Sequence, residues 1–180
     1  RPMDDDLDIS GWDLPKALQL LRKSNPPLLE WLQSPITYHE QSSLRKRLRP
    51  LMRTYYSPIS CMYHYLHMAE NNYRKYLQGD QVWTKKYFYV LRPVLACLWI
   101  EKGFGVVPIE FYKLVLKTVG APRLLREIES LLAVKRAGEE LDQGPRNEIL
   151  SGFLDRQLSR LRADLQPGPP ARDPEKLDRV

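Results

Sequence analysis

A long amphipathic helix between Ser57 and Leu77 is the strongest structural signal in this sequence. Ser57 and Pro58 are typical of a helix start, because a serine hydroxyl can cap the first turn and proline fits its first position. Gly79 and Asp80 end the pattern. The apolar residues between these limits recur every three or four positions, which places them on one helical face; they are Ile59, Met62, Leu66, Ala69, Tyr73 and Tyr76.

Similar patterns predict that nearly all of the remaining chain is helical. The expected helices cover residues 11–24, 28–33, 41–54, 82–102 and 147–165, and two more start at Pro108 and Pro122. Ser10 is expected to cap the first helix. Pro50 and Pro93 are expected to kink or split the helices that contain them. The predicted fold class is therefore mainly α, a helical bundle preceded by one short strand.

The net charge of +6 is unevenly distributed along the chain. Residues 1–13 contain five aspartates against one arginine, so the remaining residues carry all of the positive excess. A basic body suits a polyanion such as a nucleotide or RNA, because lysine and arginine offset phosphate repulsion and release counterions on binding. Surface cations kept only for solubility would give the same total.

The composition is that of an ordinary globular protein. Hydrophobic residues make up 43% and charged residues 28%, and no apolar run approaches the length of a membrane span. We therefore expect no membrane partner. The two cysteines, Cys61 and Cys97, form no Cys-x-x-Cys pair, and no signal peptide is visible. A cytoplasmic location with reduced thiols is the simplest expectation.

Two carboxylates precede the first predicted helix. If the stretch from Asp6 to Ser10 is a strand, Leu7 and Ile9 can enter a core while Asp6 and Asp8 face the other way. Such a pair could help to hold Mg²⁺ or Mn²⁺, since hard cations prefer carboxylate oxygens completed by water and phosphate. Short Asp-x-Asp pairs are common, however, and without further context a solvated acidic edge is the more frequent explanation.

Three sequence words together resemble a known family. They are SGWDLPKALQLLRKSNPPLLEWLQSPI, YHYLHMAENNYRKYLQG and KKYFYVLRPVLACLWIE. The chain is similar over residues 6–154 to the predicted nucleotidyltransferases associated with RNA ligases (RlaP-like), in the polymerase-beta-type nucleotidyltransferase superfamily. The resemblance implies a metal-dependent transfer of a nucleotidyl group from an NTP to an acceptor, with RNA as a candidate. It also implies that Asp8 is the third catalytic carboxylate.

The chain departs from the superfamily pattern at its beginning. No Gly-Ser turn followed by Asp-x-Asp at the expected distance occurs in the sequence. We therefore expect the C-terminal part of a nucleotidyltransferase, in which residues 1–12 are the last strand of the catalytic core, residues 13–165 a helical domain and residues 166–180 a disordered proline-rich tail. A naturally shortened homologue without catalysis is the alternative. By itself this chain is expected to be inactive.

The segment Lys85 to Arg92 carries the predicted nucleotide-binding residues. On a helix, Lys85, Tyr89 and Arg92 lie at i, i+4 and i+7 and share one face, which suits phosphate contacts beside a stacked base. Solvated cations and packed tyrosines would give the same pattern. The basic cluster from Arg45 to Arg53 is open to the same two explanations, an RNA-facing patch or a solvated face.

Two histidines at helical spacing give a weaker metal signal. His64 and His67 are three residues apart, but a zinc site would need at least one more ligand and no motif supplies it. Two function classes thus remain open on the sequence: an enzyme of nucleotidyl transfer, and a non-catalytic helical module that binds nucleotide or RNA. The acceptor, the preferred NTP and the oligomeric state are not defined by the sequence.

Overall fold

The computed structural model describes residues 10–40, 43–137 and 142–165. The predicted strand with Asp6 and Asp8 and the predicted tail from residue 166 both lie outside the described residues. Within them the fold is mainly α, as predicted. The helices are α1 (Leu14–Arg22), α2 (Pro26–Gln33), α3 (Leu44–Tyr55), α4 (Pro58–Tyr76), α5 (Lys86–Glu101), α6 (Phe111–Thr118), α7 (Pro122–Arg136) and α8 (Glu148–Asp164).

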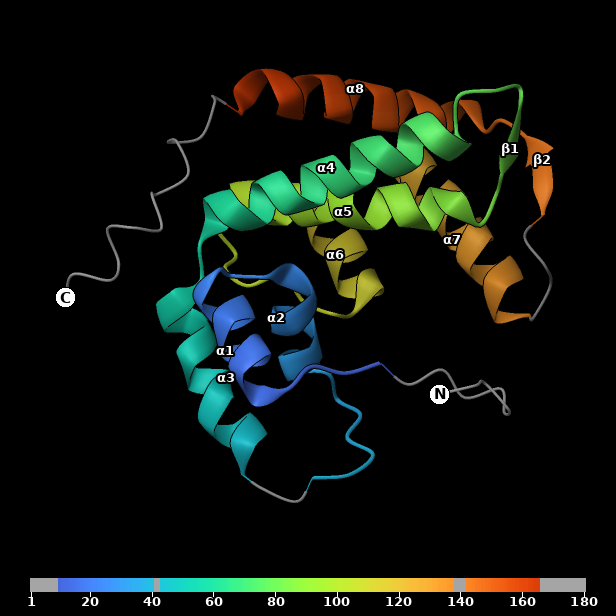
Figure 1. The fold of residues 1–180 in the computed structure, drawn as a ribbon. Helices are drawn as coiled ribbons and strands as arrows, with labels where there is room; N and C mark the ends of the chain where they lie inside the picture. Colours follow the sequence, from blue (N-terminus) through green and yellow to red (C-terminus); the bar gives the residue numbers. More distant parts are fainter. Residues whose placement is uncertain (1–9, 41–42, 138–141, 166–180) are drawn as a thin grey trace.

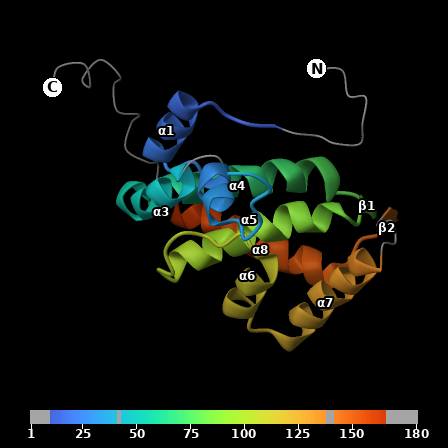
Figure 2. The same cartoon turned by 90° about the horizontal axis from the view of Figure 1, so that it is seen from below.

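Helix α5 forms the centre of the molecule. Ten of its sixteen residues are buried, and it contacts α4, α6 and α8. Figure 1 shows α4 and α5 side by side, with α8 along one side of the pair and α6 and α7 below it. Figure 2 shows α1 and the α6–α7 pair on opposite sides of α4 and α5. Both faces of α5 are therefore covered, which explains why its sequence is apolar almost all round.

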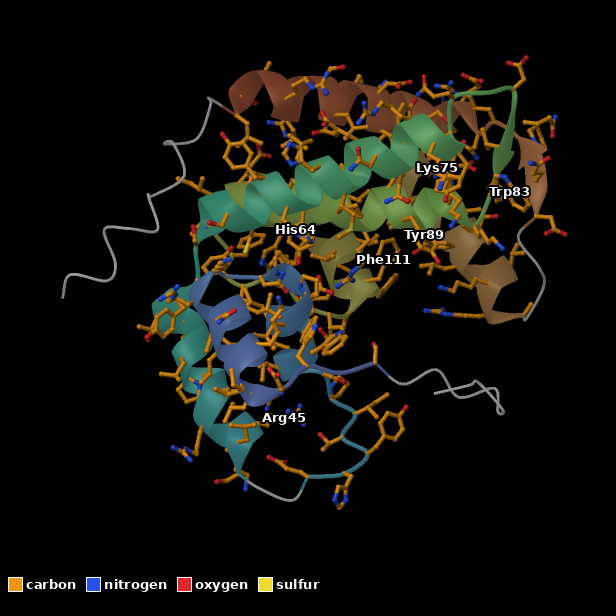
Figure 3. All side chains as sticks on the ribbon, in the orientation of Figure 1. Arg45, His64, Lys75, Trp83, Tyr89 and Phe111 are labelled. Carbon is orange, nitrogen blue, oxygen red and sulfur yellow. The ribbon has the colours of Figure 1, made fainter. Side chains whose placement is uncertain are left out.

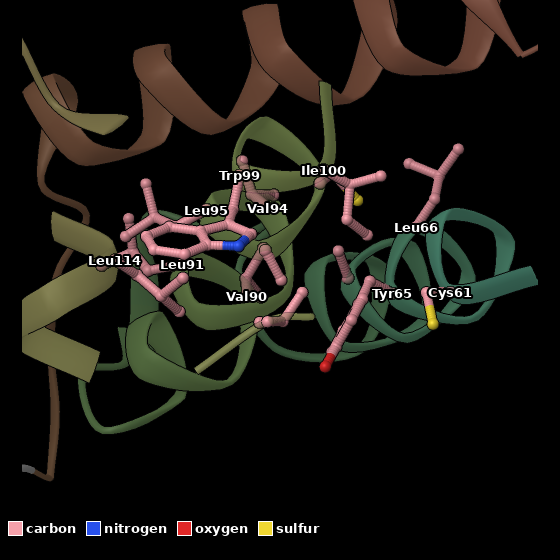
Figure 4. Close-up of a cluster of buried hydrophobic side chains, with 14 of the residues drawn as sticks. Cys61, Tyr65, Leu66, Val90, Leu91, Val94, Leu95, Trp99, Ile100 and Leu114 are labelled. Carbon is pink, nitrogen blue, oxygen red and sulfur yellow. The ribbon is translucent and has the colours of Figure 1, made fainter. Parts of the chain in front are cut away.

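The core between these helices is filled by closely packed aliphatic and aromatic side chains. Figure 4 shows Tyr65 and Leu66 of α4 on one side of this cluster, next to Val90 and Ile100 of α5, and Trp99 of α5 on the other side with Leu114 of α6. Cys61 and Cys97 are both buried free thiols and belong to this core. None of the described helices combines the length and the apolar character that a membrane span requires.

A short two-stranded sheet corrects the predicted start of the fifth helix. Residues 82–85 were expected to be helical, but β1 (Gln81–Trp83) pairs antiparallel with β2 (Gln143–Pro145). Val82 is almost fully buried and is flanked by exposed Gln81 and Trp83, the alternation typical of a strand. The partner strand lies sixty residues away, so no local pattern could indicate the pairing.

Other predicted boundaries also change. Asp13, not Ser10, caps α1, because its carboxylate accepts a hydrogen bond from Lys16 N at 2.8 Å. Pro108 precedes α6 and does not start it, since Glu110 is the residue at the helix cap. Helices α3 and α5 each run through their internal prolines, Pro50 and Pro93, without a break. Packing around α5 outweighs the local cost of the lost hydrogen bond at Pro93.

Candidate nucleotide-binding surface

Lysines and aromatic rings gather where α4 ends and α5 begins. We call this surface the lysine–aromatic patch; it comprises Lys75, Tyr76, Trp83, Lys85, Lys86 and Tyr89. The Lys86 ammonium lies between two rings, 4.4 Å from the centroid of Tyr76 and 4.2 Å from that of Tyr89. Lys75 lies 5.1 Å from the Tyr76 centroid. These distances are typical of cation–π contacts, so one lysine links the two helices through their tyrosines.

The strand β1 adds a second aromatic–lysine pair to the patch. Lys85 lies 5.5 Å from the ring centroid of Trp83, and Figure 3 shows Lys75, Trp83 and Tyr89 at the same end of the α4–α5 pair. Trp83 faces outward because its neighbour Val82 points into the core. The connection from α4 through β1 to α5 therefore brings side chains from three elements to one surface.

Helix α7 extends this surface with a further cation. Lys135 lies 5.1 Å from the ring centroid of Phe88, and Phe88 packs edge-to-face on Phe111 of α6 at 5.7 Å. Lys135 therefore lies next to the residue that precedes Tyr89. Four lysines from α4, α5 and α7 thus lie along one end of the helical bundle.

The patch has the chemistry of a site for phosphates and bases. Within the described residues, Lys75, Lys85 and Lys86 form no ion pair with a carboxylate, and Trp83 and Tyr89 are 39% and 53% exposed. The pKa of Tyr76 is lowered by its hydrogen bond with Lys75 and by the charges of Lys75 and Lys86. Unpaired ammonium groups attract phosphate, and exposed rings offer flat faces for bases to stack on.

Of the three predicted nucleotide-binding residues, the structure brings two into the patch. Lys85 and Tyr89 belong to it, with Lys85 as the residue that precedes the first turn of α5. Arg92 points elsewhere: its guanidinium lies 2.9 Å from the Glu30 carboxylate and donates to the carbonyls of Ile109 and Pro108 at 2.9 and 3.2 Å. Its assignment as a nucleotide ligand stays a prediction, and the structure adds a role in joining α2 to α5.

Glu30 is the centre of that internal network. It also accepts a hydrogen bond from Tyr65 Oη at 2.6 Å, so α2, α4 and α5 meet at one carboxylate. Burial, followed by the proximity of Glu30, raises the pKa of Tyr65 and keeps its phenol a neutral donor. Because the Glu30 and Arg92 side chains are only 17% and 26% exposed, this pair is more than a surface contact.

The basic cluster on α3 divides into two kinds of residue. Arg45 is partly buried and holds the chain after α2, donating hydrogen bonds to Leu32 O, Ser34 O and the Thr37 hydroxyl. It is therefore not a simple outward-facing cation, as the helical spacing suggested. Lys46, Arg47 and Arg53 are exposed and form no ion pair within the described part of the chain.

The described residues hold no group of three or more histidine, cysteine or acidic side chains that could bind a metal ion. His64 and His67 therefore lack the additional ligands that a zinc site needs. The pKa of His64 is lowered by burial, and its Nε2 atom is buried without a hydrogen-bond partner among the described groups. Asp6 and Asp8, the predicted metal ligands, lie outside the described residues.

Comparison with known proteins identifies the family of the chain. The sequence model of the RlaP family, described as "RNA repair pathway DNA polymerase beta family", matches residues 1–180. The chain belongs to the RlaP family. An uncharacterized protein of Bacillus subtilis (strain 168), YcgL, is 48% identical over 161 residues, which cover 89% of this chain and 62% of YcgL. The chain thus spans less than two thirds of the relative's length. No solved structure matches it significantly.

Sequence reasoning on this RlaP chain missed Tyr76, Lys75 and Trp83 as site residues. Tyr76 was counted as part of the apolar face of α4, and Trp83 was placed in the helix after it, whereas it belongs to the strand β1. A sequence signal for this surface was nevertheless present, because the words YRKY and WTKKYFY both combine neighbouring cations with aromatic residues on either side. Recognising that the two words meet requires the β1–β2 pairing, which turns the chain between α4 and α5.

Proposed function

We propose that this RlaP chain is the helical part of a metal-dependent nucleotidyltransferase. The enzyme would move a nucleotidyl group from an NTP to an acceptor, for which RNA is the first candidate. The lysine–aromatic patch is the observation that carries the proposal, because it combines unpaired cations with exposed rings in a family named for RNA repair.

Each residue class in the patch has a separate task in this proposal. The ammonium groups of Lys75, Lys85 and Lys86 contact the triphosphate and offset its charge. Tyr89 or Trp83 provides a ring on which the base stacks, an interaction that tolerates different bases. Asp8, with Asp6 beside it, would bind Mg²⁺ or Mn²⁺, which activates the acceptor hydroxyl and neutralises the leaving pyrophosphate when bound.

Nucleotide titration of patch variants tests the proposal. Tyr89→Ala should weaken binding of a nonhydrolysable NTP by about 1 to 3 kcal/mol, the range for losing a base–aromatic stack. Lys85→Ala should weaken it by a similar amount, because a charge-assisted hydrogen bond is lost. Matched controls are Tyr38→Ala, at a ring that is 96% exposed, and Lys16→Ala on α1. Equal effects of patch and control variants would place the nucleotide elsewhere.

The second candidate is a non-catalytic module that binds nucleotide or RNA through the same patch. The absence of a Gly-Ser turn with a following Asp-x-Asp in this sequence favours it for the chain taken alone. The two candidates differ in one measurable respect. A binding module retains its affinity when Mg²⁺ and Mn²⁺ are removed with a chelator, whereas an NTP held jointly by metal and patch loses affinity.

A further inference from the structure

A basic groove lies between α3 and the segment that joins α5 to α6. Its cavity has a volume of about 990 Å³. Lys46, Arg49 and Arg53 line one wall, and Lys113 in the first turn of α6 lines the other. Residues 46, 49 and 53 are three and four positions apart, so they share one face of α3. Arg47 is not among the lining residues.

The groove has a large excess of positive charge. Four cations face it against one carboxylate, Glu110, and none of these five side chains forms an ion pair with any part of the chain that the structure describes. Arg49 is fixed in place, because its Nε donates to Leu32 O at 2.7 Å. Like charges held around one hollow repel each other, and an anionic ligand would relieve that repulsion.

The wall opposite α3 is rigid and partly aromatic. The Gly105 carbonyl accepts hydrogen bonds from Tyr56 Oη at 2.9 Å and from Trp99 Nε1 at 3.2 Å. Gly105 has φ +80°, a conformation that favours glycine. Phe104 packs edge-to-face on Trp99 at 4.9 Å and is still 45% exposed. An exposed ring therefore stands at the edge of a preformed basic hollow.

The dimensions of the groove fit a nucleic-acid strand better than a single phosphate. Arg53 lies seven positions after Lys46, which corresponds to about 10 Å along α3, and one phosphate cannot contact both ends. The cavity is also at the upper end of the range of about 300 to 1,000 Å³ for small-molecule sites. Cations that follow a groove beside an exposed ring are the usual means of binding single-stranded nucleic acid without sequence preference.

We propose that this basic groove binds the sugar-phosphate backbone of single-stranded RNA. The groove begins beyond the C-terminal end of α5, whereas the lysine–aromatic patch surrounds its N-terminal end, so the two sites are distinct. The inference extends the proposed function by adding a place for the acceptor strand. It is tested by binding alone, and it can therefore fail while nucleotidyl transfer stands, or hold while transfer fails.

The test is fluorescence anisotropy of the 180-residue chain with a labelled single-stranded RNA of mixed sequence. Arg53→Glu should weaken binding at least tenfold, whereas Arg47→Glu, an exposed cation on the same helix, should change it less than about threefold. Arg53→Ala should also reduce the slope of log K against log salt by about 0.7, the value for one lost phosphate contact with a single strand. Circular dichroism checks that each variant is folded.

A second variant distinguishes the binding of an RNA strand from the binding of a simple polyanion. Phe104→Leu keeps an apolar side chain against Trp99 but removes the flat ring. It should weaken RNA binding about fivefold or more and leave the affinity for inorganic tripolyphosphate unchanged. Single-stranded DNA of the same sequence shows whether the 2′-hydroxyl contributes.

Three results would overturn the inference. Equal losses from Arg53→Glu and Arg47→Glu would mean that only the overall charge of α3 attracts RNA. Tripolyphosphate that displaces RNA at equal affinity, with no effect of Phe104→Leu, would make the groove a site for small anions. An acidic peptide that binds as tightly as RNA and depends on Arg53 would make it a protein-docking surface.

Discussion

Arg92 shows how one side chain can fit a functional pattern and serve the fold. Its spacing from Lys85 and Tyr89 suggested a shared nucleotide-binding face. In the structure its guanidinium is bound by Glu30 and by two carbonyls of the segment before α6. Helical spacing defines the side of α5 on which Arg92 lies, but it contains no information on whether α2 covers that side.

Arg92→Ala should lower the free energy of unfolding by about 1 to 3 kcal/mol, because Glu30 loses its charged partner in a partly buried site. Urea unfolding followed by circular dichroism measures this change. Arg47→Ala, on an exposed face of α3, should stay within about 0.5 kcal/mol of the wild type. The double variant with Glu30→Gln should lose less than the sum of the single variants. Unchanged stability together with weaker NTP binding would instead make Arg92 a nucleotide ligand.

The sequence predicted the bounds of some helices more accurately than those of others. Helix α4 was predicted almost to the residue, because Ser57 and Pro58 mark its start and its apolar spacing is regular. The start of α5 was not, since β1 exists only through its pairing with β2 sixty residues later. Lys85 and Tyr89 could be proposed because they lie four residues apart in one sequence segment. Tyr76 of α4 and Trp83 of β1 lie next to them only because the chain turns between α4 and α5.

A polar triad connects α4 to α8 through the residue after β2. Tyr73 Oη donates to the Asp155 carboxylate, and Arg146 Nη2 donates to Asp155 at 2.9 Å and to Tyr73 Oη at 3.2 Å. Burial, followed by the hydrogen bond to Asp155, raises the pKa of Tyr73 to about 12, above the ordinary value of 10.0. The triad therefore favours the neutral phenol in the folded state.

We expect stability to fall between pH 10 and pH 12 in part because of Tyr73. In this range the unfolded chain releases the phenolic proton while the folded chain retains it, so unfolding becomes more favourable as pH rises. Tyr73→Phe should reduce the slope of the unfolding free energy against pH by up to about 1.4 kcal/mol per pH unit. Urea titrations across this range measure it. An identical slope in both proteins would show that Tyr73 ionises equally in the two states.

At the scale of the whole molecule, the proposed nucleotidyl transfer would need groups that the described helices do not supply. We expect the 180-residue chain to incorporate no labelled nucleotide into mixed RNA acceptors with Mg²⁺ or Mn²⁺, because its sequence contains no Gly-Ser turn followed by Asp-x-Asp at the distance of the superfamily pattern. When a segment carrying these motifs is supplied, Asp8→Asn should abolish transfer while thermal stability stays unchanged. Robust incorporation by the chain alone would contradict this expectation.

The length of the central helix α5 sets how far a bound strand must reach to connect the two proposed sites. Its sixteen residues span about 24 Å, with the lysine–aromatic patch around its N-terminal end and the basic groove beyond its C-terminal end. At about 3.4 Å per stacked nucleotide, a strand needs roughly seven nucleotides to bridge this interval. On the two proposals above, an acceptor shorter than this could occupy the groove without reaching a nucleotide held at the patch, so only longer strands would span both proposed sites.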